Sequence, residues 1–272
     1  MKAKVIRIII VAMIFSTVAG FTVQSDNTCS QIIAVIASAI VGAVMSSVYE
    51  LIDTHGQGLA TWFKSQILYH NKDLYISFSY LYKIEVDGKY LLVRGHRMKD
   101  RYQPIGGVYK YYPEARDFLD SIRFVPDAEF VNNNETDDLR IQIKGKYLLR
   151  FYDWFFSMRN REYDPSREFY EELIAPRFLD EDDFRQLRYR KVDVHNKGIT
   201  KSIVPERIAE VIYADIFEVT LTDEQKHAVK RAVEEHPDDL CLAAPEEMRS
   251  RRYAGSVEMN LGNNVTWLLG EE

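Results

Sequence analysis

The chain has 272 residues and a formal net charge of −6, a length that suits one domain of ordinary size plus additional segments. Mild acidity argues against a general nucleic-acid-binding protein, which carries a basic stripe, so we expect neither DNA nor RNA as a partner. The two cysteines, Cys29 and Cys241, do not make a disulfide framework, and no CxxC or Cys/His cluster indicates a zinc site.

Residues 1–52 are predicted to form a two-helix transmembrane hairpin. Two apolar segments, residues 5–23 and residues 32–52, each approach the roughly 18–20 apolar residues that cross a bilayer. The polar turn QSDNTCSQ separates them. Basic residues lie at the start of the first segment, and the next one along the chain is Lys64. The positive-inside rule then predicts two spans in the cell inner membrane, with both termini in the cytoplasm.

A cleaved signal peptide is the competing interpretation of the same N-terminus. Small residues around Ala19 and Gly20 follow the basic start and the apolar run, as they do before a cleavage site. Cleavage would leave the second segment as the anchor and place the large domain outside. The first apolar run is long for a signal peptide, and the body has no disulfide pairs, so we favour the hairpin.

Small residues recur at every fourth position in both segments. Such stripes let membrane helices approach closely and drive their packing. Two interpretations stay open: the two helices pack on each other within one chain, or one stripe serves the hairpin and the other an oligomer. The residues concerned are Ala12, Ser16 and Gly20 in the first segment and Ala34, Ser38, Gly42 and Ser46 in the second.

A juxtamembrane connector, residues 53–72, leads into the body of the chain. It begins with a glycine-containing break and continues as a predicted helix that carries Trp62 and Phe63. An aromatic pair just beyond a membrane span is typical of an interfacial anchor.

In the body, residues 73–272, the hydropathy period changes to two. Residues 74–86 alternate, Asp87-Gly88 predicts a hairpin turn, and residues 89–95 return. Strands and helices then mix, which predicts an α/β (α+β) domain with a mixed β-sheet and flanking helices. We expect further strands over 139–145, 187–194 and 206–221, helices over 146–158, 164–176 and 222–236, and a docking strand or clip at 267–269.

The stretch DPSREFYEELIAP, residues 164–176, raises the question of function. Asp164 is a good N-cap residue, and Pro176 ends the helix because the residue before a proline leaves the α region. Three carboxylates share one helix face. A run of like charges is most often a solvated face, so the surroundings must decide between a metal-binding helix and a remnant of one. The three are Glu168, Glu171 and Glu172.

At this point the chain resembles a known family. PIGG at residues 104–107 resembles the glycine pair that opens the Nudix box, and REFYEELI at residues 167–174 resembles the helix of that box. Two membrane segments followed by such a domain are similar to the transmembrane–Nudix effectors of CBASS antiphage systems, whose domain is called the SMODS-associated Nudix domain. The resemblance implies that residues 73–272 form a Nudix-like domain.

The same resemblance implies a function and partners. The domain would sense a cyclic di- or oligonucleotide made by a partner nucleotidyltransferase. Binding would activate the transmembrane segments of a homo-oligomer to disrupt the lipid bilayer of the inner membrane, which causes abortive infection. In this interpretation the chain is an effector rather than an enzyme.

In Nudix hydrolases the helix glutamates hold Mg²⁺ or Mn²⁺, because a hard cation that bridges a diphosphate needs clustered carboxylate oxygens. If the site is functional, the resemblance therefore assigns Mg²⁺ to the three glutamates, with Arg167 positioning a carboxylate. Two departures from the box favour a remnant. About 60 residues separate Gly107 from Arg167, and Arg159 stands where the upstream glutamate is expected.

Candidate ligand-binding residues cluster beside the glycine pair. Their basic side chains follow the second predicted strand and suit phosphates, although a solvated basic loop explains them equally well. They are Arg94, Arg97 and Arg101, together with Gly106 and Gly107. The alternative functions are a membrane-tethered, metal-dependent Nudix hydrolase of nucleoside diphosphate derivatives and a membrane protein whose body binds another protein. No Ser/His/Asp constellation has motif spacing, so no catalytic nucleophile is predicted.

Overall fold

The computed structural model describes residues 58–95, 101–127, 137–252 and 260–270. The two predicted spans lie outside these residues, as do residues 53–57 of the connector. Residues 58–63 of the connector, with Trp62 and Phe63, are helical, as predicted. Within the described ranges, no helix has both the length and the apolar character needed to cross a membrane. The chain divides into two compact units, Met1–Phe63 and Lys64–Glu272, and the fold below is that of the second unit.

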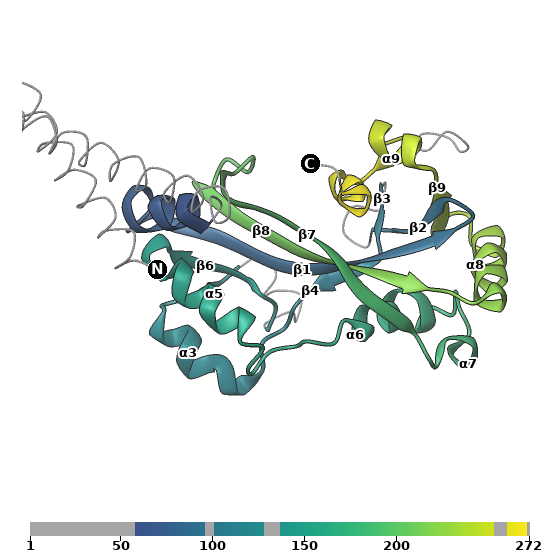
Figure 1. The fold of residues 1–272 in the computed structure, drawn as a ribbon, viewed down its shortest axis with the longest axis horizontal. Helices are drawn as coiled ribbons and strands as arrows, with labels where there is room; N and C mark the ends of the chain where they lie inside the picture. The colour runs from purple at the N-terminus through teal and green to yellow at the C-terminus, as the bar shows by residue number, and fades with distance from the viewer. Residues whose placement is uncertain (1–57, 96–100, 128–136, 253–259, 271–272) are drawn as a thin grey trace, which may run out of the picture. The chain divides into compact units, whose positions relative to one another are not determined.

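The central strand of the sheet is β1 (Asp73–Val86), which runs through the middle of Figure 1. One edge of β1 pairs in parallel with β8 (Ala209–Thr220), and β8 pairs antiparallel with β7 (Arg188–Lys201). The other edge pairs antiparallel first with β6 (Arg140–Lys144) and then with β4 (Gly106–Val108). Parallel and antiparallel pairs therefore occur in one sheet, which confirms the predicted mixed sheet.

A second group of strands continues from the far end of β1. The chain turns at Asp87 and Gly88, both with positive φ, which is the geometry of a two-residue hairpin turn. It returns as β2 (Lys89–Arg94), so the predicted hairpin is confirmed. The remaining strands are β3 (Arg101–Pro104) and β9 (Leu240–Ala243), both antiparallel to β2, β10 (Asn260–Leu261), parallel to β3, and β5 (Val125–Pro126), antiparallel to β6.

Helices lie on both sides of the β1–β8 ladder. In Figure 1, α3 and α5 lie against one side, and α9 lies on the other. The bounds are η1 (Lys64–Leu68), η2 (Pro113–Ala115), α3 (Arg116–Ser121), η3 (Gly145–Tyr147), α5 (Leu148–Phe156), α6 (Ser166–Phe169), η4 (Tyr170–Ile174), α7 (Glu181–Phe184), α8 (Asp223–Glu235), α9 (Pro245–Ser250) and η5 (Asn263–Leu269).

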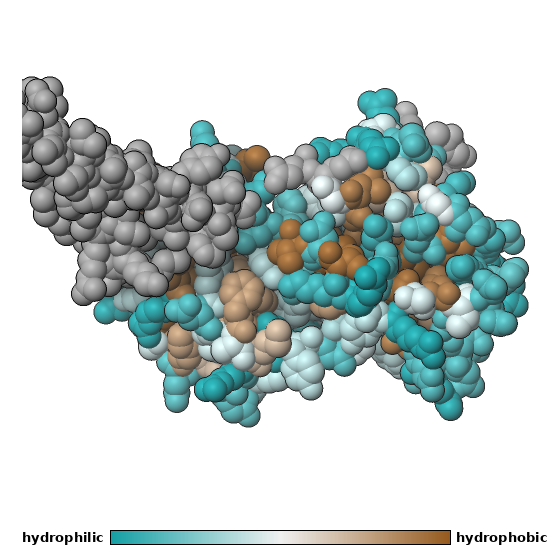
Figure 2. All heavy atoms as spheres, viewed as in Figure 1, coloured by the Kyte–Doolittle hydropathy of each residue, from teal (hydrophilic) through white to brown (hydrophobic). Residues whose placement is uncertain are grey.

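The alternation of β1 builds two cores, one on each face of the sheet. Even-numbered residues from Leu74 to Val86 enter the larger core, which α3, α5 and α8 cover. Leu81 enters the smaller one, together with Val265 and Leu268 of η5. Because successive side chains of a strand point to opposite faces, one strand serves both cores. On the face drawn in Figure 2, hydrophilic residues cover α8 and the periphery, and hydrophobic residues gather toward the middle.

The predicted helices over 146–158 and 222–236 are confirmed as α5 and α8. Thr222 and Gln225 form a capping box at the start of α8, in which each side chain accepts from the backbone N–H of the other. The C-terminal segment is a clip rather than a strand: η5 is a 3₁₀-helix that buries Leu268. β9 and α9 were not predicted, because both are short and carry no strong periodicity.

Candidate functional site

The helix predicted over residues 164–176 changes its winding partway along. It begins as α6, whose N-cap position is Pro165, one residue later than predicted. Asp164 Oδ1 still accepts the Ser166 N–H at 2.9 Å and so bonds the first residue of the helix. It continues as η4, a π-helical turn in which the Ala175 N–H donates to the Tyr170 carbonyl at 2.8 Å. Such turns are rare and occur frequently at functional sites. Phe169 and Leu173 are buried in the larger core and hold the helix against the sheet.

The glycine pair of PIGG lies in β4, directly beneath this helix. Gly106 has a φ of +153°, and a Cβ there would lie 2.2 Å from the Tyr80 carbonyl oxygen of β1. A Cβ on Gly107 would lie 1.8 Å from Glu168 Oε1. Position 106 therefore requires glycine because of the sheet backbone, whereas a side chain at position 107 would force the Glu168 carboxylate to move. At this pair the backbone of β4 therefore approaches β1 and the helix closely.

Glu172 joins the helix to the glycine pair. Its Oε2 accepts the Gly106 N–H at 2.9 Å, across 66 positions of sequence. The side chain is almost fully buried. Burial raises the pKa of Glu172 to about 8, because desolvation disfavours the carboxylate more strongly than the Gly106 N–H stabilises it.

Arg167 binds the remaining carboxylates of the site. Its Nη1 donates to Glu168 Oε1 at 2.6 Å and to Glu171 Oε2 at 3.1 Å. Its Nε and Nη2 donate to the two oxygens of Glu162 at 2.9 and 3.2 Å. A further donation reaches the Val108 carbonyl of β4 at 3.1 Å. The predicted role of Arg167, positioning a carboxylate by ion pairing, therefore agrees with the geometry.

Glu162 is one of the site residues that the sequence did not predict. It precedes Arg167 by five positions rather than the eight at which the box places its upstream glutamate. The structure nevertheless brings it to Arg167 as a buried partner, and it also accepts the Lys110 N–H at 3.2 Å. Arg159, which occupies the expected position, donates its backbone N–H to Ser157 instead. Glu114, the nearest acidic residue after PIGG, lies in η2 and does not line the site.

Charge and burial oppose each other in this cluster. Burial raises the pKa of Glu168, while the neighbouring Arg167 lowers it in part. Burial also opposes the charge of the Arg167 guanidinium, but its hydrogen bond to Glu162 and the charge of Glu168 outweigh this and raise the pKa of Arg167. The site therefore holds its charges in pairs rather than singly.

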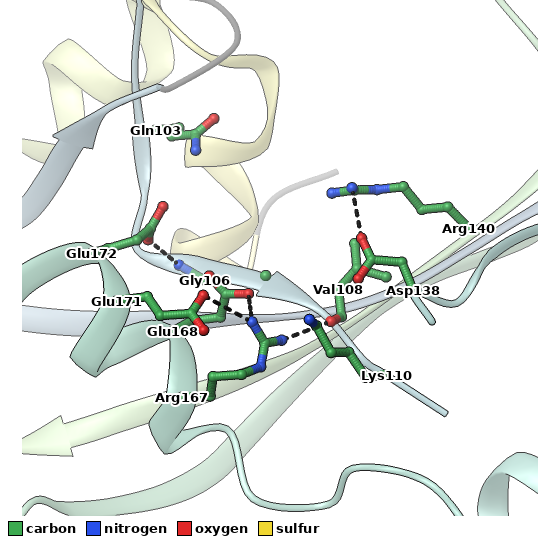
Figure 3. A pocket seen from close by; sticks show the side chains of 11 residues that line it. Gln103, Gly106, Val108, Lys110, Asp138, Arg140, Arg167, Glu168, Glu171 and Glu172 are labelled. Atoms are coloured by element: carbon green, nitrogen blue, oxygen red, sulfur yellow. Dashed lines mark hydrogen bonds and ion pairs between the residues drawn. The ribbon is translucent and has the colours of Figure 1, made fainter. Parts of the chain in front are cut away.

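A cavity of about 300 Å³ opens between the helix and the strands. The helix carboxylates lie along one side and Lys110, Asp138 and Arg140 along the other, as Figure 3 shows. Arg140 donates to Asp138 at 3.0 Å, and Lys110 lies 3.6 Å from Asp137. The residues that line the cavity are Gln103, Gly106, Gly107, Val108, Lys110, Asp138, Arg140, Arg167, Glu168, Glu171 and Glu172.

The predicted ligand-binding residues are divided by the structure. Gly106 and Gly107 line this cavity, whereas Arg94 lines a second one beside it, which shares Glu172 as a wall. Arg97 lies outside the described residues. Arg101 lies in β3 and lines neither of the two cavities. Sequence reasoning did not include Gln103, Lys110, Asp138 or Arg140, which reach the cavity from strand segments without a motif.

The helix carboxylates Glu168, Glu171 and Glu172 are the candidate ligands for a metal ion. Among the residues that it describes, no three His, Cys, Asp or Glu side chains are grouped so as to hold a metal ion. Glu168 and Glu171 face the Arg167 guanidinium and Glu172 faces a backbone N–H. The three carboxylates do not fit a metal ion in this arrangement, and the Mg²⁺ assignment stays a prediction.

Comparison with known proteins gives one result. A model of the SMODS-associated NUDIX domain matches residues 73–269. No curated protein and no solved structure matches the chain. The matched range includes the glycine pair, the helix and every residue that lines the cavity.

Proposed function

The chain belongs to the SMODS-associated NUDIX domain family, a domain typical of CBASS-type effectors, and from this premise we propose that its body is a cyclic-nucleotide sensor. The ligand is a cyclic di- or oligonucleotide made by a partner nucleotidyltransferase. Its binding in the cavity between β4 and the Nudix-like helix, which is formed by α6 and η4, activates the N-terminal segments, which then disrupt the inner membrane as a homo-oligomer.

One observation carries the sensor interpretation. The carboxylates that a Nudix hydrolase would use for a metal are bound internally, by Arg167 and by the Gly106 N–H, in the arrangement described above. Hydrolysis requires preorganised groups aimed at the reacting phosphate. A cavity whose carboxylates already have partners is suited to holding a ligand rather than to cleaving it.

The opposite side of the cavity offers groups for phosphate. Lys110 lies 3.6 Å from Asp137, in a pair whose side chains are both partly exposed. Such a pair contributes little free energy, typically about 0–1 kcal/mol, so a phosphate oxygen readily replaces the carboxylate. Arg140 presents a second cation, and Gln103 adds an amide for neutral hydrogen bonds. At about 300 Å³ the cavity is at the lower end of ligand sites, which suits one nucleotide of a larger ligand.

The sequence supports the proposed action of the N-terminal segments on the membrane. The two apolar runs and their small-residue stripes are those of a closely packed hairpin. A hairpin of this kind, linked to a ligand-binding domain, couples ligand binding to the bilayer.

The test uses the full chain in detergent with a panel of cyclic di- and trinucleotides. A ligand that binds the native state stabilises it by mass action, about 2.7 kcal/mol at 100 times its Kd, so the melting temperature rises with concentration. We expect stabilisation by one class of cyclic nucleotide and unchanged nucleotide after incubation with Mg²⁺. Metal-dependent turnover would support the tethered hydrolase instead, and no stabilisation by any compound would overturn the sensor.

A matched pair of variants locates the binding. Lys110→Gln removes a cation from the cavity, whereas Lys197→Gln removes an exposed cation of β7. We expect the first to weaken stabilisation by the ligand and the second to leave it unchanged. The proposed disruption of the bilayer is tested separately, by release of a dye from vesicles of bacterial phospholipids that carry the chain, with and without the stabilising nucleotide.

A further inference from the structure

A second cavity, of about 320 Å³, lies beside the first and has a different chemistry. Glu172 lines both cavities, so the two lie on either side of this one side chain. The second cavity is bounded by the end of β2 and by the segment that precedes β9. Across from them lies the turn that follows η4, with Pro176 and Phe178.

The strand side of this cavity is fixed in place by backbone hydrogen bonds. The Arg94 N–H donates to the Asp239 carbonyl at 2.7 Å, which sets the two residues side by side. The Tyr102 hydroxyl donates to the Pro237 carbonyl at 2.8 Å and so ties the segment before β9 to β3. The Leu240 N–H closes the turn onto the His236 carbonyl at 2.9 Å.

The opposite side presents an aromatic ring that is also held. The Phe178 N–H donates to the Leu173 carbonyl at 3.1 Å, directly behind the π-helical turn. The Phe178 ring lies with its centroid 4.9 Å from that of His236, and the side chain is half-buried against the larger core. A ring held in this way gives a flat apolar surface at low entropic cost.

The lining of the second cavity includes Phe178, Asp239 and Arg94. An aromatic ring, a carboxylate and a guanidinium are groups by which proteins recognise nucleobases. An aromatic ring stacks on the face of any base. A carboxylate accepts N–H groups from a base edge, and a guanidinium donates to the O6 and N7 acceptors of guanine. The first cavity, by contrast, contains Lys110 and Arg140 but no aromatic side chain in its lining. The groups that line the first cavity therefore suit the phosphate of a nucleotide, and those that line the second suit its base.

We propose that the second cavity is the nucleobase subsite of this domain and that it selects guanine, stacked on Phe178 and bound along its edge by Asp239 and Arg94. The inference rests on the proposed function and adds to it the position and the identity of one base. Guanine presents two adjacent donors, N1–H and the exocyclic amino group, to a carboxylate, and its two acceptors suit an arginine. Adenine presents a single exocyclic amino group and no ring N–H at the equivalent edge, so it satisfies the pair less well.

The experiment measures the affinities of the full chain in detergent for cyclic di-GMP and cyclic di-AMP by calorimetry. Wild type is expected to bind cyclic di-GMP more tightly. Phe178→Leu keeps the apolar volume but removes the ring, and we expect about ten-fold or greater loss of affinity for both ligands. Phe178→Tyr keeps the ring and is expected to bind as wild type does. The melting temperature without ligand shows that each variant is folded.

The edge contact is tested by a second matched pair. Asp239→Asn is expected to reduce the ratio of the two affinities by about ten-fold, because one amide oxygen replaces two carboxylate oxygens. Asp238→Asn, an exposed neighbour that does not line the cavity, is expected to leave the ratio unchanged.

The outcomes separate this inference from the proposed function. If wild type binds a cyclic nucleotide but Phe178→Leu and Asp239→Asn bind it with unchanged affinity and ratio, the nucleobase subsite is overturned and the sensor function stands. A wild-type preference for cyclic di-AMP overturns the guanine assignment. If wild type binds neither these two ligands nor any other cyclic nucleotide, the subsite and the proposed function both fail.

Discussion

Glu162 and Arg167 form a two-point ion pair at the start of the Nudix-like helix. The two oxygens of Glu162 accept from Nε and Nη2 of Arg167 at 2.9 and 3.2 Å, so the planar guanidinium is fixed in orientation. The same guanidinium contacts Glu168 and Glu171, and therefore this pair orients two of the three helix carboxylates.

The first prediction is that Arg167→Lys destabilises the domain. A lysine ammonium cannot donate in the planar fork that Glu162 accepts, and it leaves part of a mostly buried carboxylate without a partner. Breaking such a pair costs on the order of 3 kcal/mol. Urea denaturation of the full chain in detergent, followed by tryptophan fluorescence, measures the loss.

The control for this variant is Glu171→Gln, which removes another partner of the same guanidinium. The Glu171 side chain is 53% exposed, so the pair is screened by solvent and its loss is expected to cost less than about 1 kcal/mol. Equal losses in the two variants would show that the Glu162 pair has no special role.

The local parts of the fold are those that the sequence predicts correctly. The hairpin of β1 and β2 follows from alternation on both sides of Asp87-Gly88, and the start of α8 follows from Thr222 and Gln225. Each of these signals involves residues a few positions apart. For the same reason the start of the Nudix-like helix beside Asp164 is predictable to within one residue.

The long-range parts of the site are not predictable in this way. The Gly106–Glu172 hydrogen bond joins residues 66 positions apart, and Glu162 reaches Arg167 from a spacing that differs from that of the family box. The π-helical turn at Tyr170–Ile174 leaves no mark on a hydrophobic pattern read at 3.6 residues per turn. Lys110 and Arg140 enter the cavity because two strands pair with β1, and that pairing is a property of the whole sheet.

The second prediction concerns the glycine pair. Gly107→Ala places a Cβ where Glu168 Oε1 now lies, so the carboxylate must move and the cavity must change shape. We expect the variant to lose most of the thermal stabilisation that the cyclic nucleotide gives to wild type. Gly58→Ala is the matched control, because a Cβ there has no neighbour within 4 Å. Undiminished stabilisation of Gly107→Ala would mean that the ligand binds elsewhere.

The third prediction concerns a buried carboxylate behind the site. Asp215 accepts the hydroxyls of Tyr109 and Tyr213, each at 2.6 Å, and pairs with Lys191. Tyr109→Phe removes one donor from a buried acceptor, which costs about 1–3 kcal/mol. Tyr112→Phe removes an exposed hydroxyl and is expected to be neutral. Thermal unfolding of the two variants checks the difference, and equal melting temperatures would contradict the assigned hydrogen bond.

The fourth prediction is a pH dependence of stability that originates at Glu172. Burial raises the pKa of this carboxyl in the folded chain from 4.5 to about 8. Between these two values the folded state holds a proton that the unfolded state has released, so the free energy of unfolding falls as the pH rises. Below about pH 4.5 both states are protonated, and above about pH 8 both are ionised, so Glu172 adds no slope there.

Glu172→Gln removes the ionisation and keeps an amide oxygen that accepts the Gly106 N–H. We expect the variant to match wild type near pH 5 and to exceed it in stability at pH 8, where wild type must bury a charge. The Glu171→Gln variant retains Glu172 and should keep most of the wild-type slope, because the charge of Glu171 is a smaller cause of the raised Glu172 pKa than burial. Denaturation midpoints at half-unit steps from pH 5 to pH 9 measure the three slopes. If the wild-type slope persists in Glu172→Gln, the Glu172 carboxyl is already ionised in the folded wild-type chain. Glu172 lines both cavities, so its charge state affects each of them.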